Sequence, residues 1–104
     1  MKIPKIVSIG AHEFQVKETI FPDDTTGSFQ RFEELIQINS EVPESAQAEA
    51  LLHEILHGVN TIFKLELTHD QIYVLSESLF QVMRHNDLDF TYPTMKAKKG
   101  KKAN

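Results

Sequence analysis

The sequence contains no cysteine among its 104 residues. This absence excludes a disulfide framework and a thiolate metal site, so any metal ligands must come from His, Asp or Glu. No apolar run approaches the roughly 18 residues that a membrane span needs, and the apolar run at residues 1–7 is too short for a signal peptide. We therefore expect a cytoplasmic protein of a bacterium or a phage that has no membrane partner.

Positive charge is scarce until the last residues of the chain. The net charge is −4, but residues 96–102 hold five lysines and no acid, so residues 1–95 carry about −9 by subtraction. An acidic body repels a phosphate backbone, so nucleic acid is an unlikely partner except weakly through the lysine-rich tail. The length suits one domain, which we place at residues 1–92, followed by a disordered tail at 93–104.

Alternating apolar residues predict three short strands in the first part of the chain. Residues 3–9 and 14–20 form a predicted hairpin around the turn Gly10-Ala11-His12. Residues 21–28 are rich in turn formers and are predicted to be a loop. Residues 35–39 form the third strand, in which Ile36 and Ile38 alternate with polar residues.

Apolar residues at helical spacing predict two long helices in the second part. The first opens at Pro43-Glu44-Ser45 and runs to Phe63, with Ala50, His53 and His57 opposite its apolar face and Glu54 flanking them. After the short link 65–67, Thr68 and Gln71 have the spacing of a capping box, and the second helix runs to about Asn86. Its expected core stripe consists of Ile72, Leu75, Leu79, Val82 and Met83.

These elements together predict an α+β fold. A small antiparallel or mixed sheet of about three strands packs on the first helix, and the short link makes the second helix antiparallel to it. Phe90 and Tyr92 are expected to fold back on the core.

The first helix carries the pattern His53-Glu54-Ile55-Leu56-His57. Two histidines four residues apart project from one face of a helix about one turn apart, so their imidazoles can share a metal ion. The carboxylate of Glu54 lies near the same face and can deprotonate a water bound to that ion. This is the His-Glu-x-x-His pattern of zinc hydrolases, and histidine ligands favour zinc in practice.

A hydrolytic zinc ion needs a third protein ligand, and the second helix offers His69, Asp70 and Glu77. Helical phase places His69 and the small Ser76 beside the apolar stripe, whereas Asp70 and Glu77 point largely away. We therefore favour His69. Glu77 and Asp70 stay open as alternatives, because Glu77 lies nearer the level of the two histidines in a strictly antiparallel pair.

The motif helix resembles that of small zincin-like metallopeptidases of phages and prophages, which belong to the gluzincin-like group. The segments that carry the resemblance are Leu51-Leu52-His53-Glu54-Ile55-Leu56-His57, then Leu75-Ser76, Leu79-Phe80-Gln81-Val82-Met83 and Asn86, with the strand Ile36-Gln37-Ile38-Asn39 upstream. The resemblance implies a minimal zincin core whose second helix completes the zinc site. Such proteins usually have a glutamate at the position of His69.

Two functions follow from the sequence. The first is a zinc-dependent peptidase with one zinc ion on His53, His57 and His69, with Glu54 as the general base and a peptide or protein as substrate. The second is a non-catalytic binding or adaptor protein of a phage or mobile element that keeps the metal for stability. Neither fixes an oligomeric state.

Overall fold

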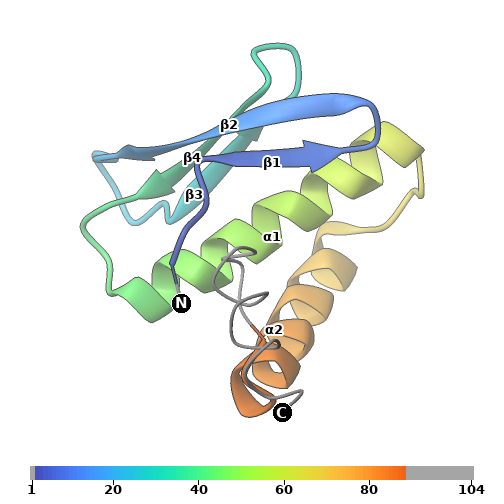
Figure 1. The fold of residues 1–104 in the computed structure, drawn as a ribbon. Coiled ribbons are helices and arrows are strands. Elements are labelled where there is room, and N and C mark those ends of the chain that lie inside the picture. Colours follow the sequence, from blue (N-terminus) through green and yellow to red (C-terminus); the bar gives the residue numbers. More distant parts are fainter. Residues whose placement is uncertain (1, 89–104) are drawn as a thin grey trace, which may run out of the picture.

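A computed structural model describes residues 2–88 of the chain, and Figure 1 shows a sheet covering one side of a long helix, with a second helix on that helix's other side. The strands and helices, in chain order, are β1 (Ile6–Ile9), β2 (His12–Thr19), β3 (Gly27–Gln30), β4 (Leu35–Asn39), α1 (Glu44–Phe63) and α2 (His69–His85). The predicted α+β class is confirmed.

The sheet has four strands rather than the three predicted, in the order β1-β2-β4-β3. It is mixed, because β2 and β4 are parallel while the two outer pairs are antiparallel. The strand that the sequence analysis missed is β3, whose first two residues fell in the predicted loop at 21–28. It has four residues with Phe29 as its single large apolar side chain, so it shows no alternation, and its pairing with β4 defines it.

The core lies between the sheet and α1. Phe14, Ile36 and Ile38 from the sheet meet Leu51 from α1, and all four side chains are almost fully buried. The prediction that Ala50 lies on the non-core side of this helix is wrong, since Ala50 belongs to the same buried cluster. Because alanine is small, Ala50 packs in the core and also lines the cavity next to His53.

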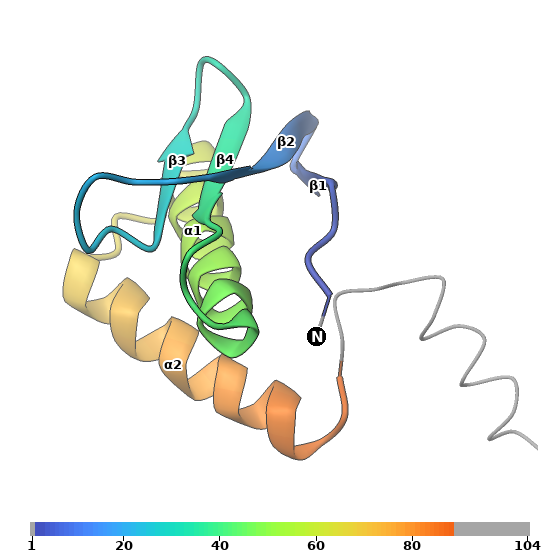
Figure 2. The same cartoon turned by 90° about the vertical axis from the view of Figure 1, so that its left-hand side faces the viewer.

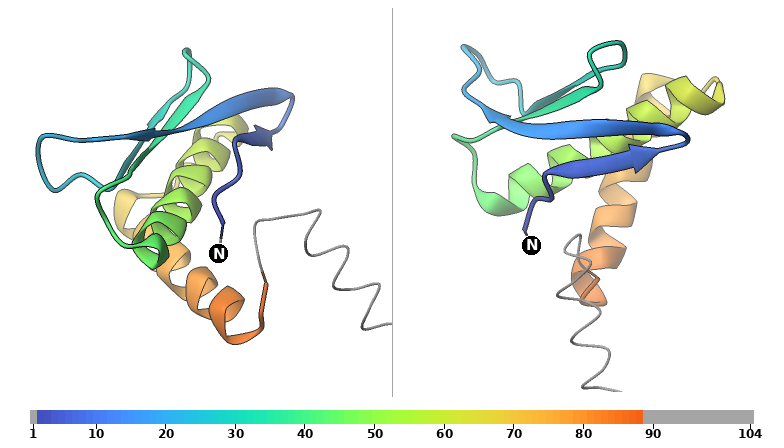
Figure 3. Two further views of the ribbon diagram at one scale, coloured as in Figure 1. Left: turned by 60° about the vertical axis from the view of Figure 1, so that its left-hand side comes forward. Right: turned by 45° about the horizontal axis from the view of Figure 1, so that its top comes forward.

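The predicted turn between β1 and β2 is shorter than expected, because β2 already begins at His12. Gly10 takes a positive φ of 61°, which favours glycine, and it lies against Ile62 and Phe63 at the end of α1. Figure 3 shows this end of the hairpin close to the C-terminal part of α1. The end of the hairpin therefore packs against the last turn of α1.

The link between the helices turns sharply at Lys64 and Glu66, both of which have positive φ. The side chain of Asn60 accepts a hydrogen bond from the backbone N–H of Leu67 at 2.8 Å and donates one to its carbonyl at 3.3 Å. The predicted capping box of Thr68 and Gln71 is present. The chain therefore returns along α1 as predicted, and Figure 2 shows α2 on the side of α1 that faces away from the sheet.

The predicted core stripe of α2 is only partly correct. Ile72 is buried, but Leu75, Leu79 and Val82 are 39–44% exposed, and the second buried residue of this helix is Ser76. A helix that packs on one neighbour buries a narrower face than one inside a larger core. The expected contacts of Phe90 and Tyr92, and the lysine-rich tail, lie outside the described residues.

Candidate metal centre

The two motif histidines project from the middle of α1, on the side covered by α2. Because they are four residues apart, their rings lie one helical turn apart with centroids 4.7 Å from each other. Their Nε2 atoms approach to 3.1 Å. Both side chains are half-buried. The helix alone therefore supplies two imidazole nitrogens that point at the same place.

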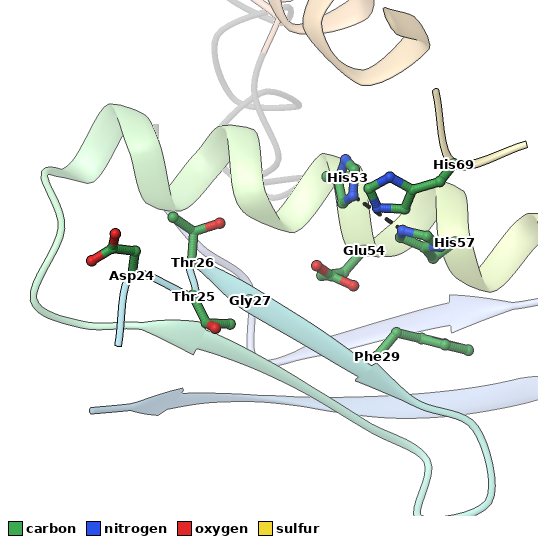
Figure 4. A pocket seen from close by; sticks show the side chains of 9 residues that line it. All are labelled: Asp24, Thr25, Thr26, Gly27, Phe29, His53, Glu54, His57 and His69. Carbon is green, nitrogen blue, oxygen red and sulfur yellow. Dashed lines mark hydrogen bonds between the residues drawn. The ribbon is translucent and has the colours of Figure 1, made fainter. Parts of the chain in front are cut away.

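His69 completes the group from the first residue of α2. Its ring centroid lies 5.5 Å from that of His53 and 5.2 Å from that of His57. One nitrogen from each ring falls within a set whose members are all within 4.8 Å of one another. Figure 4 shows the three imidazoles gathered together above the strand β3. Three histidines that can hold a metal ion are thus assembled by the link between the helices.

The alternatives to His69 lie elsewhere. Asp70 lines a different surface hollow with Leu67 and Val74, and Glu77 lines a cavity that His53 and His69 also line but does not belong to the cluster of ligand atoms. The hydrogen bonds between Asn60 and Leu67 hold the chain against the last turn of α1 just before α2 begins. His69, in the first turn of α2, thereby comes next to both motif histidines, whereas Tyr73 and Ser76 in the following turns lie near His53.

The spacing of the two motif histidines suits a tetrahedral ion. Zinc binds imidazole nitrogens at about 2.0–2.1 Å, so two ligand nitrogens at a tetrahedral angle lie about 3.3–3.4 Å apart. The observed 3.1 Å between the Nε2 atoms of His53 and His57 needs a shift of only a few tenths of an ångström. Three neutral imidazoles leave the fourth position of such an ion open.

The electrostatics also favour a metal over a proton. Burial lowers the pKa of His53, and the neighbouring His57 and His69 lower it further. Burial likewise lowers the pKa of His57, with a smaller contribution from His69. Since a metal ion binds only the unprotonated ring, depressed pKa values keep these nitrogens available below the ordinary pKa of histidine.

Glu54 is more buried than the sequence suggested. Its side chain is 7% exposed and lies between α1 and β3, below the histidines in Figure 4. Burial raises the pKa of Glu54 from 4.5 to about 7. The room for this carboxylate comes from Gly27, where an added Cβ would lie 3.2 Å from its Cγ and 3.3 Å from its Oε2.

A cavity of about 620 Å³ opens over the site. It is lined by Glu54 and the three histidines on one side and by the segment 24–29 on the other, through Asp24, Thr25, Thr26, Gly27 and Phe29. Sequence reasoning missed this wall because it assigned most of the segment to a loop. The glycine within it was the available signal, since a glycine in a strand often marks a close approach.

A second cavity of about 370 Å³ adjoins the first and shares Thr26, His53 and His69 with it. Its wall includes Ala46, Ala50 and Ser76, with Glu49, Tyr73 and Glu77 beside them. The pKa of Tyr73 is raised, chiefly by a hydrogen bond to Glu77. This tyrosine ring lies 6.4 Å from that of His53, centroid to centroid.

The remaining described histidines lie away from the metal centre. His12, at the start of β2, lies 3.3 Å from the carboxylate of Glu34. His85, at the end of α2, pairs with the side chain of Gln81.

Comparisons of the chain with protein-family models, with curated proteins and with solved structures found no match. Among the described residues, no helix is both long and apolar enough to cross a membrane. What the structure shows is a small α+β fold with three histidines that can hold a metal ion.

Proposed function

We propose that this protein is a zinc-dependent peptidase of the small zincin-like type. One observation carries the proposal: the three histidines and the buried carboxylate of Glu54 line the same open cavity, which has room for a substrate. A metal site used only for stability has no need of a buried acid beside it. The combination is that of a hydrolytic centre.

Zinc held by His53, His57 and His69 would polarise the scissile carbonyl and lower the pKa of a coordinated water. Glu54 takes the proton of the attacking water and later delivers it to the leaving amine. Burial raises the pKa of Glu54 in the metal-free chain, so this carboxyl group holds a proton more readily than an exposed glutamate does.

The substrate would bind as an extended peptide along β3. This strand is at the edge of the sheet, and within residues 2–88 only β4 pairs with it. An edge strand offers unpaired backbone groups, so a peptide can add to it as a further strand. Because residues of β3 also line the cavity with the histidines, a peptide on this edge passes the metal centre.

Metal analysis tests the zinc site first. Protein purified without a polyhistidine tag should contain about one zinc per chain, and the double variant His53→Ala with His57→Ala should contain none. His12→Ala and His85→Ala are matched controls that should retain it. Absence of zinc from the wild type, or full occupancy in the double variant, contradicts the metal assignment.

Cleavage of a peptide library then tests catalysis. Glu54→Gln keeps the shape of the side chain but removes the base, so it should retain zinc and lose cleavage. A wild type that binds zinc but cleaves no member of the library contradicts the peptidase assignment and leaves the metal site intact.

A wild type that binds zinc without cleaving peptides favours the alternative function, a metal-stabilised binding protein of a phage or mobile element. The exposed apolar side chains of Leu75, Leu79 and Val82 on one face of α2 support it, since such a face is typical of a surface that meets a partner. The cytoplasmic location and the phage or bacterial setting remain predictions from the sequence.

A further inference from the structure

Ser76 is the one polar residue of α2 that is buried, with 1% of its surface exposed. Its hydroxyl donates a hydrogen bond to the carbonyl of Tyr73 at 2.9 Å. The same oxygen lies 3.2 Å from Nδ1 of His53. Because the hydroxyl proton is already engaged, the oxygen faces the imidazole with a lone pair.

We propose that Ser76 is a positioning residue that fixes the proton of His53 on Nδ1 and so aims the lone pair of Nε2 at the metal. A neutral imidazole carries one proton, and the hydrogen bond made by one ring nitrogen decides which nitrogen carries it. The Nδ1–H of His53 donates to the Ser76 oxygen, which leaves Nε2 unprotonated on the side where Nε2 of His57 lies 3.1 Å away.

The chain of hydrogen bonds joins the metal centre to the backbone of α2. It runs from the ring of His53 through the Ser76 hydroxyl to the Tyr73 carbonyl. A ligand held in this way keeps its ring orientation before the metal arrives, which lowers the cost of binding. The same helix supplies His69, so α2 contributes one ligand directly and orients a second through Ser76.

Serine is suited to this position by size as well as by chemistry. The residue lies where α2 packs against α1, and a larger side chain would separate the helices. A serine hydroxyl in a helix commonly bonds to a carbonyl three or four residues earlier, which fixes its rotamer. The acceptor for His53 is therefore held in place by the helix itself.

This inference rests on the zinc site of the proposed function but not on peptide cleavage, and the first measurement needs no metal. Long-range ¹H–¹⁵N spectra of the metal-free wild type at pH 8 report which ring nitrogen of each histidine carries the proton. We expect His53 to be protonated on Nδ1. Protonation on Nε2 overturns the inference whether or not the protein binds zinc.

The second measurement is the zinc dissociation constant of Ser76→Ala, obtained by competition with a chromophoric chelator. Loss of such an outer partner typically weakens metal binding by about 10- to 100-fold, and we expect a loss in this range. The spectra of the metal-free variant should show His53 with its proton shared between both nitrogens. Unchanged zinc affinity together with an unchanged tautomer contradicts the assignment.

Ser78→Ala is the matched control. Ser78 lies on the same helix and its hydroxyl donates to the carbonyl of Val74 at 2.8 Å, but it is exposed and contacts no histidine. Its replacement removes the same kind of side chain–backbone bond, so the zinc affinity and the tautomer should stay as in the wild type. Equal losses in both variants would assign the effect to the helix rather than to the His53 contact.

Discussion

The buried carboxylate of Glu54 makes the metal-free protein sensitive to alkaline pH. Burial raises the pKa of this group from 4.5 to about 7, so the folded chain holds its proton more tightly than the unfolded chain does. The resulting contribution to stability is complete below pH 4.5 and is lost as the pH rises through about 7. One pH unit corresponds to about 1.4 kcal/mol, so the full loss is about 3 kcal/mol above pH 8.

Glu54→Gln removes this titration while keeping the size of the side chain. We expect the metal-free variant to match the wild type near pH 5 and to exceed it by about 3 kcal/mol at pH 8. Urea unfolding followed by circular dichroism measures the difference, since such a change moves the midpoint by more than about 1 M. Chelator must be present, because a nearby divalent ion favours the carboxylate and reduces the gap.

Glu13→Gln is the control for the loss of one negative charge, because Glu13 is exposed on β2. Its effect on the free energy of unfolding should be small and nearly constant with pH. If the difference between the wild type and Glu54→Gln were also constant from pH 5 to 8, burial of the Glu54 carboxylate would not be the source of the effect.

Three further predictions concern the same region. Gly27→Ala places a Cβ against the Glu54 side chain, so kcat/KM for a cleaved peptide should fall about tenfold or more while zinc content stays at one per chain. Gly58→Ala places a Cβ 2.9 Å from the Phe29 ring. The resulting overpacking costs about 1–3 kcal/mol, whereas alanine favours a helix over glycine by about 1 kcal/mol, so the melting temperature should drop. Burial lowers the pKa of His53, so protons compete with the metal for this ligand only at a lower pH than for an ordinary histidine, and the apparent zinc dissociation constant, measured by chelator competition, should rise as the pH falls.

The parts of the fold that depend on local pattern could be predicted from the sequence. Both helices, the Thr68 cap and the pairing of His53 with His57 follow from spacing along one segment of chain. The choice of His69 also followed from helical phase, and the structure places it with the other two histidines. Each of these inferences needs only the geometry of a single helix.

The parts that depend on distant contacts could not be predicted. Strand β3 exists because β4 pairs with it, and its four residues carry no periodic signal of their own. The burial of Glu54 requires that strand to lie over it, so it was missed for the same reason. The bond from Ser76 to His53 joins positions 23 residues apart, which no sequence spacing indicates.

The sparse packing of α2 has a consequence for folding. Ile72 and Ser76 are its only buried side chains, whereas α1 is held by the whole sheet. In the metal-free chain α2 should therefore open as a separate unit at a lower free energy than α1, and its amides should exchange with deuterium first. An ion bound by His53, His57 and His69 would link α2 to α1. The concentration of free metal would then set the fraction of molecules in which α2 is folded.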